Sequence, residues 1–163
     1  MKELHKLESS WTYWYHSSNN TNWGVESYNK LITINSIEHF LMMTNYLNLK
    51  KLKKGYLFIM KDNILPIWES EDNKNGGCWS FKIPENKGFN ILQLVLKYII
   101  GCTITKDFNN YNLINGVSIS FKKYFYIKIW LKKNTSNFNI FCRDFVNLIK
   151  KLDIIKLYKA YKK

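Results

Sequence analysis

The sequence has few of the residues on which common catalytic and metal sites are built. Its three cysteines and three histidines are widely scattered, so no pairing of the two types has the spacing of a zinc site. The glycine-rich motifs of nucleotide-binding enzymes and the short motifs of metalloproteases and hydrolases are absent. Asp62, Glu69 and Asp107 are isolated carboxylates without metal-ligand spacing. We therefore expect no catalytic centre, no metal and no cofactor.

Long hydrophobic runs are lacking as well. Residues 1–10 are polar and have no apolar segment of the kind that a secretory signal needs. The longest apolar stretch, residues 91–102, is broken by Gln93 and Lys97 and is too short to cross a bilayer. We therefore expect no membrane association, reduced thiols and a cytoplasmic location.

Basic and aromatic residues, in contrast, are abundant. The chain of 163 residues has a formal net charge of +13, an aromatic content of 17% and six tryptophans. This length suggests one domain over residues 1–163, with a short N-terminal tail of about residues 1–7. A basic surface attracts polyanions such as nucleic acid. Part of the charge is discounted as a sign of such binding, because lysine, asparagine and isoleucine are all abundant, as in proteins from A+T-rich genomes.

The patterning predicts strands with three interspersed helices. Asn35 is expected to cap the first helix, with Glu38 reaching back to it, and the Ile37–Leu47 spacing gives that helix an apolar face. A basic turn is expected at residues 50–55. Hairpin-like spacing favours an antiparallel sheet and an α+β fold. The predicted strands are residues 9–16, 28–34, 56–60, 77–83, 117–122, 126–131 and 154–160, and the later helices are residues 90–100 and 138–152.

Two tryptophans occupy positions that core packing does not explain. Trp23 follows the polar loop 17–22, and Trp68 precedes an acidic polar run that begins at Glu69. A large ring in a polar loop is costly to expose unless it binds something. Two such rings could sandwich a flat ligand, and in a basic protein the obvious one is a nucleobase. A carboxylate beside them could accept the two adjacent N–H groups of guanine.

Several motifs resemble the eukaryotic translation initiation factor 4E family, whose members bind the 7-methylguanosine cap of mRNA. The strongest is a Pro-x-Trp-Glu segment followed closely by Gly-Gly-x-Trp. The resemblance extends from about His5 to the C-terminus. The motifs are Trp11-Thr12-Tyr13-Trp14-Tyr15, Pro66-Ile67-Trp68-Glu69 with Gly76-Gly77-Cys78-Trp79, and Gly116–Lys122 with Ile127-Lys128-Ile129-Trp130.

The resemblance implies a curved antiparallel β-sheet with three α-helices on its convex face. On the concave face, Trp23 and Trp68 would sandwich the cap base, and Glu69 would bind its Watson–Crick edge. Trp130 would approach the N7 methyl group. The implied phosphate contacts are lysines of the following hairpin, Lys122, Lys123 and Lys128.

Other positions depart from the family pattern around the phosphates. Cys78 stands where the family often has a phosphate-binding arginine, and Tyr126 stands near a usual lysine. The phosphate contacts are therefore either rebuilt from other lysines or weakened. Because Lys163 follows the last predicted strand closely, we do not expect the C-terminal loop that covers the second nucleotide in the family.

The surface implied for protein partners also changes. The family uses a helix tryptophan to hold the partner motif Tyr-x-x-x-x-Leu-hydrophobic, and this sequence has Leu41 there. We expect a scaffold of the initiation factor 4G type to bind poorly, and a more apolar partner helix to suit Leu41 and Leu94. Alternatively, both leucines are simply buried or tolerated. The residues implied for this surface are His5, Ile37, Leu41, Leu94 and Lys97.

Three binding functions remain open from the sequence. The first is a monomeric cap-binding initiation factor, from a parasite or from a large DNA virus that would use it in the host cytoplasm. The second is a repressor of the same fold that occupies caps without recruiting the scaffold. The third is a single-stranded RNA-binding protein without cap selectivity, for which lysines and aromatics would give steep salt dependence.

Overall fold

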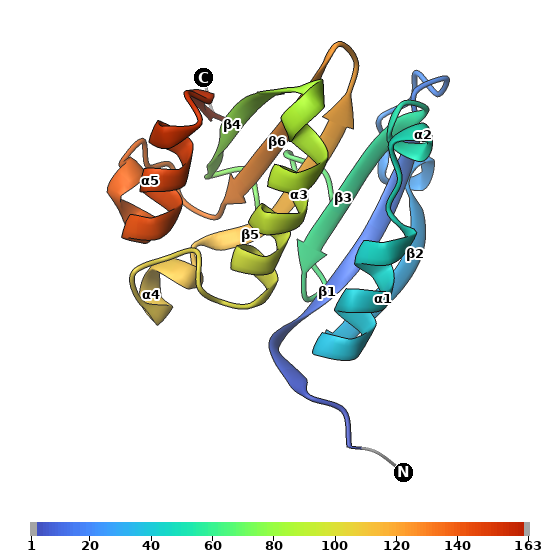
Figure 1. Ribbon diagram of the computed structural model, residues 1–163. Helices are drawn as coiled ribbons and strands as arrows, with labels where there is room; N and C mark the ends of the chain where they lie inside the picture. The colour runs from blue at the N-terminus through green and yellow to red at the C-terminus, as the bar shows by residue number, and fades with distance from the viewer. Residues whose placement is uncertain (1–2, 162–163) are drawn as a thin grey trace.

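The computed structural model describes residues 3–161, which form a seven-stranded antiparallel sheet with helices packed on one face (Figure 1). The strands follow the order β2-β1-β3-β5-β6-β4-β7 across the sheet. This curved sheet confirms the predicted α+β fold. The strands are β1 (Lys6–Ser17), β2 (Asn29–Ser36), β3 (Gly55–Lys61), β4 (Gly77–Pro84), β5 (Ile114–Phe121), β6 (Tyr124–Leu131) and β7 (Ile155–Ala160).

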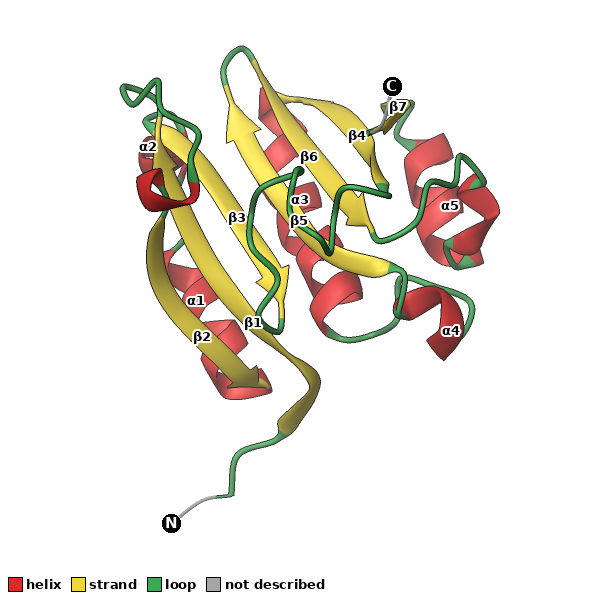
Figure 2. Cartoon of the chain, turned by 180° about the vertical axis from the view of Figure 1, so that it is seen from behind, coloured by secondary structure: helices red, strands yellow, loops and turns green. Residues whose placement is uncertain are grey.

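Three longer helices cover one face of the sheet, while the other face carries loops and the short 3-10 turn Val25–Ser27 (Figure 2). Two further helices are single turns that the sequence pattern did not predict. The long helices are α1 (Ile37–Tyr46), α3 (Glu85–Ile100) and α5 (Arg143–Lys151), and the short ones are α2 (Leu49–Leu52) and α4 (Phe108–Tyr111).

The main core lies between the sheet and the helices, because successive side chains of each strand point to opposite faces of the sheet. In β6, Phe125, Ile127 and Ile129 are fully buried on the helical side. Helix α3 comes very close to this strand at Gly88, where an added Cβ would lie 1.9 Å from the Phe125 ring. Only a glycine allows that approach, which fixes the position of α3 against β6. The residues that alternate with Phe125, Ile127 and Ile129 along β6 face the opposite surface of the sheet.

The first helix begins differently from the prediction. Strand β2 continues through Ser36, which pairs with Lys6 and then caps α1 by accepting a 3.3 Å hydrogen bond from the His39 N–H. Asn35 is therefore part of the strand and is not the cap. The Glu38 carboxylate does not reach back to a cap residue but lies 2.6 Å from His5 Nδ1.

The predicted N-terminal tail and basic turn are also corrected. Lys6 already belongs to β1, and residues 1–2 lie outside the described residues. The stretch after Asn48 forms helix α2, because the Asn48 side chain accepts a hydrogen bond from the Lys51 N–H and caps it.

The last helix is shorter than predicted because its first residues bond to another segment. Residues 138–140 form a 3-10 turn, and Phe141 makes an isolated antiparallel bridge with Thr105. The Cys142 N–H then donates to the Ile104 carbonyl at 2.7 Å. The backbone groups that would open a helix at 138 are thus already used, and α5 starts at Arg143.

Candidate functional site

The face of the sheet opposite the helices carries a second cluster of aromatic and apolar side chains. Its buried members are Tyr28, Phe58, Met60 and Trp130. The loop of residues 62–76 between β3 and β4 crosses this face (Figure 2). Strand β3 therefore buries both of its faces, and the second cluster forms a floor beneath the loop.

Trp23 and Trp68 line one cavity above this floor. The cavity has a volume of about 190 Å³, and Trp130 and Lys128 from β6 contribute to its wall. Trp23 is 49% exposed and Trp68 is 50% exposed, whereas Trp130 is buried. The Trp130 Nε1–H donates a 2.9 Å hydrogen bond to Ser118 Oγ, which holds that ring in place. The two loop tryptophans that the sequence singled out thus lie on the same cavity, which we call the base slot.

The orientation of Trp23 is set by a histidine that sequence reasoning did not select. The rings of His16 and Trp23 are stacked, with centroids 3.9 Å apart and an angle of 4° between their planes. His16 is fully buried, and its Nε2–H donates to the Asn22 carbonyl at 2.8 Å. One face of the indole is therefore covered by the imidazole, and the other remains available. An alternating strand pattern through His16 was the only sequence signal for this contact.

The loop that carries Trp68 is held from inside by Asn73. This side chain is fully buried, and its Nδ2 donates to the carbonyls of Leu65 and Ile67, at 3.0 and 2.8 Å. Its Oδ1 accepts a 2.9 Å hydrogen bond from Asn115 Nδ2 on β5. The loop is thus attached to the sheet through one amide. An asparagine in a polar loop is ordinarily solvated, so the sequence alone did not indicate this role.

Replacing Asn73 with alanine is expected to loosen this loop. The loss of the hydrogen bonds to these two partly buried carbonyls should lower the free energy of unfolding by about 1–3 kcal/mol. Denaturant unfolding measures the change, with Asn75→Ala as a matched control, since Asn75 is exposed in the same loop. Equal stability of the two variants would contradict the role assigned to Asn73.

Glu69 is exposed and is not among the residues that line the base slot. Its charge nevertheless acts on the slot wall. Burial raises the pKa of Tyr28 to about 12, and the Glu69 carboxylate adds to that rise. Glu69 directly follows Trp68 in the chain, so this negative charge is carried by the neighbour of a residue that lines the slot.

The three predicted phosphate-binding lysines are not together. Lys128 lines the base slot, because it lies two residues before Trp130 and therefore points to the same open face of β6. Lys122 and Lys123 lie in the β5–β6 turn, where the Lys122 N–H donates to the Tyr124 carbonyl. Lys122 lines a separate pocket of only about 60 Å³. The register of this short hairpin decides this separation.

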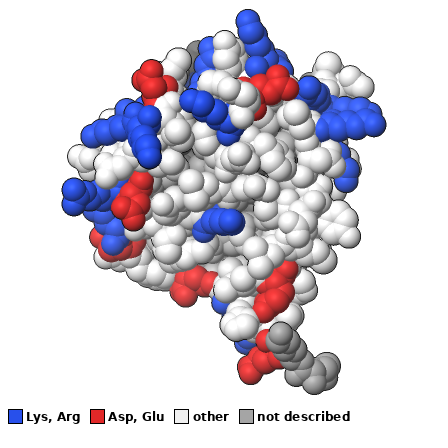
Figure 3. Space-filling model, viewed as in Figure 1, with Lys and Arg blue, Asp and Glu red and all other residues white. Residues whose placement is uncertain are grey.

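The residues predicted for partner binding are exposed on the helical side. Leu41 on α1 is 48% exposed and Leu94 on α3 is 37% exposed, so neither leucine is buried, and only that half of the alternative is wrong. Ile37 and Lys97 are also exposed, and His5 is paired with Glu38. Figure 3 shows a broad uncharged area across this face, with charged side chains mainly around its edges.

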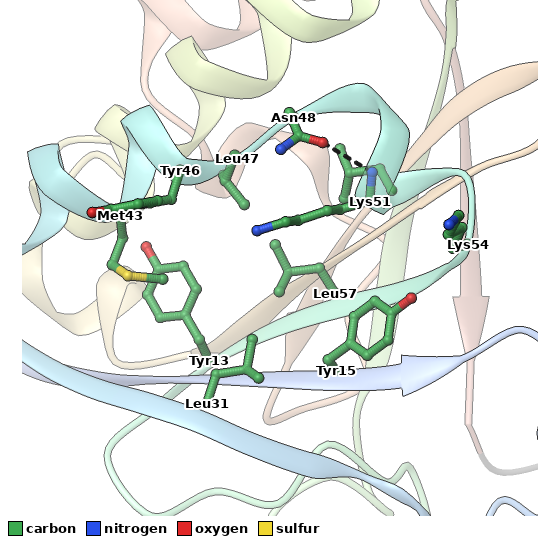
Figure 4. Close-up of a pocket in the computed structure, with 11 residues that line it drawn as sticks. Tyr13, Tyr15, Leu31, Met43, Tyr46, Leu47, Asn48, Lys51, Lys54 and Leu57 are labelled. Atoms are coloured by element: carbon green, nitrogen blue, oxygen red, sulfur yellow. Dashed lines mark hydrogen bonds between the residues drawn. The ribbon is translucent and has the colours of Figure 1, made fainter.

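An apolar pocket of about 350 Å³ lies beside α1 on the same side of the sheet. Tyr13, Leu31, Met43 and Leu57 contribute to its wall, and Lys51 extends over these side chains (Figure 4). The pocket adds apolar surface next to the helix that carries Leu41.

The described part of the chain contains no cluster of three or more potential metal ligands. None of its helices is both long enough and apolar enough to cross a membrane.

A family model described as eukaryotic initiation factor 4E matches residues 6–162. The chain belongs to the eukaryotic initiation factor 4E family. The initiation factor 4E of Dictyostelium discoideum is 30% identical over 155 residues, which cover 91% of this chain and 60% of that protein. That of Candida albicans is 33% identical over 140 residues, or 78% of this chain and 65% of that protein. A homologue from Acanthamoeba polyphaga mimivirus is 36% identical over 63 residues, or 39% of this chain and 23% of that protein.

This family member thus spans less than two thirds of the curated relatives that it matches. Among solved structures, Ascaris suum eIF4E-3 in complex with an m7G cap has a TM-score of 0.79 and 21% identity, covering 98% of this chain and 93% of that one. A schistosome eIF4E complexed with m7GpppG and 4E-BP has a TM-score of 0.79 and 19% identity, covering 96% and 90%. At these identities, the likeness establishes the shared fold.

Proposed function

We propose that this initiation factor 4E family member binds the 7-methylguanosine cap of mRNA for translation initiation, with the base stacked between Trp23 and Trp68. The proposal rests mainly on the two half-exposed indoles that line one slot, with the Glu69 carboxylate next to Trp68 in the chain. The family assignment and the cap-bound neighbours support it.

The free face of Trp23 and the ring of Trp68 supply the stacking surfaces. Stacking on an aromatic side chain contributes about 1–3 kcal/mol per base. N7-methylated guanine is a cation, so each indole adds a cation–π attraction of about 0.5–2 kcal/mol. Methylated guanine should therefore bind more tightly than guanine itself.

Glu69 and Trp130 complete the recognition of the base. The Glu69 carboxylate would accept hydrogen bonds from the N1–H and N2–H of guanine, and such charge-assisted bonds contribute about 1.5–3 kcal/mol each. Trp130 would approach the methyl group from the floor of the slot. No bond is made or broken, so the proposed activity is binding and not catalysis.

Intrinsic tryptophan fluorescence, titrated in parallel with 7-methyl-GTP and GTP near physiological salt, tests this function. We expect strong but incomplete quenching by the methylated nucleotide alone, because Trp11 and Trp79 are buried on the helical side of the sheet. Equal, salt-sensitive responses to both nucleotides would instead indicate general single-stranded RNA binding. No response to either would refute the proposal.

We further propose that the exposed apolar residues of α1 and α3 bind a helix of a scaffold-type or repressor-type partner. The schistosome neighbour is complexed with 4E-BP, which supports a partner of this kind. Leu41 and Leu94 present aliphatic surface, so the partner helix should offer apolar side chains at helical spacing. Whether that partner recruits or blocks the initiation machinery separates an initiation factor from a cap-binding repressor.

A peptide with the conventional Tyr-x-x-x-x-Leu-hydrophobic motif is expected to bind this protein weakly. Leu41→Trp should raise its affinity about fivefold or more, because a buried aromatic ring contributes about 1 kcal/mol beyond its area. Fluorescence anisotropy of a labelled peptide measures both values. Leu157→Trp, at an exposed site on the last strand, is the control. Tight binding by the unchanged protein would exclude the predicted loss of affinity.

A further inference from the structure

The apolar pocket beside α1 has the size and the wall of a small-molecule site. Its volume is about 350 Å³, and such sites span about 300–1,000 Å³. A β-bulge shapes the wall on the sheet side: Tyr13 pairs with Ile32 and Trp14 pairs with Lys30, so Leu31 is an extra residue of β2. Bulges redirect side chains, and Leu31 lines the pocket. We call this site the aliphatic pocket.

One polar atom in this apolar wall lacks a partner. The Tyr13 side chain is fully buried, and its hydroxyl has no hydrogen-bond partner among residues 3–161. Burial raises the pKa of Tyr13, so the hydroxyl stays protonated and can donate. Met43 and Lys51 line the same pocket, and their unbranched side chains can move to admit a ligand. A ligand oxygen would satisfy this hydroxyl, whereas an aliphatic side chain of a partner protein would leave it unpaired.

Positive charge lies at the same pocket. Lys51 and Lys54 line it together with no aspartate or glutamate, and neither lysine forms an ion pair within residues 3–161. The Asn48 Oδ1 accepts from the Lys51 N–H, so the amide of Asn48 has its Nδ2 group left to donate. Figure 4 shows the Lys51 side chain extending over the apolar wall. These donors and cations favour an anionic acceptor as the head group of a ligand.

We propose that the aliphatic pocket binds a medium-chain fatty acid as its free carboxylate. The carboxylate accepts a hydrogen bond from the Tyr13 hydroxyl and lies next to the Lys51 ammonium. The alkyl chain packs on Leu31 and Leu57, which line the pocket from the sheet. This site lies on the helical side of the sheet, so the inference is independent of the proposed cap binding on the opposite face.

A titration followed by NMR of ¹³C-methyl-labelled methionine tests this assignment. The Met43 methyl group reports on the pocket, and Met60, buried in the cluster on the opposite face, is an internal control. We expect decanoate to bind about tenfold more tightly than octanoate, because each buried methylene contributes about fourfold. Decylamine has the same chain as decanoate and a positive head group, so it should bind at least tenfold more weakly than decanoate.

Two of the possible results would overturn the inference at this stage. If decanoate and decylamine bound equally well, the pocket would be a general apolar surface, suited to the side chains of a protein partner. If neither acid shifted the Met43 resonance, the pocket would not be a fatty-acid site.

Variants of the head-group contacts complete the test. Tyr13→Phe removes only an unpartnered hydroxyl and should keep the fold, while affinity for decanoate falls about tenfold and that for decylamine stays unchanged. Lys51→Met should lower decanoate affinity about two- to fivefold. Lys50→Met is the matched control, since Lys50 is exposed and does not line the pocket. Unchanged decanoate affinity in Tyr13→Phe, or equal losses in the two lysine variants, would also overturn the inference.

Discussion

Replacing Trp68 with alanine is expected to lower the affinity for 7-methyl-GTP by roughly 10- to 100-fold. Trp68 is half exposed and lines the base slot, so its ring is available to one face of a bound base. Loss of one stacking partner costs about 1–3 kcal/mol, and the cation–π attraction of the methylated base is lost with it. Because GTP lacks that positive charge, its weaker binding should change less.

Isothermal titration calorimetry of the variant with both nucleotides measures this effect. Trp79→Phe is a suitable control, because Trp79 is buried on the helical side of the same sheet and should affect stability without affecting the ligand. Trp23→Ala should resemble Trp68→Ala, and it also removes the ring that stacks on His16. Unchanged 7-methyl-GTP affinity in the Trp68 variant, with its fold intact by circular dichroism, would rule out the two-tryptophan stack.

Replacing Glu69 with alanine is expected to have an effect of similar size. In the proposed complex, its carboxylate accepts two hydrogen bonds from a cationic base, each of about 1.5–3 kcal/mol. Part of that energy is recovered by water at an exposed site, so a loss of about 10- to 100-fold in affinity is expected. Glu69→Gln keeps one acceptor but loses the charge. Its affinity for 7-methyl-GTP should therefore lie between those of the unchanged protein and Glu69→Ala.

The same calorimetric titration measures the Glu69 variants. Glu71→Ala is the matched control, since Glu71 is exposed in the same loop and pairs with Lys74 at 2.6 Å. Removing Glu71 changes the net charge by the same amount as removing Glu69. If both alanine variants lost affinity equally, the role of Glu69 would be a general electrostatic one and not recognition of the base edge.

Local residue chemistry was sufficient to find the walls of the base slot. Trp23 and Trp68 stood out because large rings next to polar loops conflict with their local surroundings, and both line the same cavity. The strands were likewise predictable, because β-sheets leave a period-two pattern in the chain. The single-turn helices and the start of α5 were not, since their ends depend on hydrogen bonds to other segments.

The sequence by itself determined the α+β class, the open face on which the loop tryptophans lie and the family to which the chain belongs. Only the tertiary structure decided which side chains support those tryptophans and which lysines adjoin the slot. His16 stacks on Trp23 across a loop, Asn73 bonds to Asn115 on a distant strand, and Lys159 faces Cys78 through strand pairing. Each of these contacts joins residues through loop closure or strand register, which local patterns do not encode.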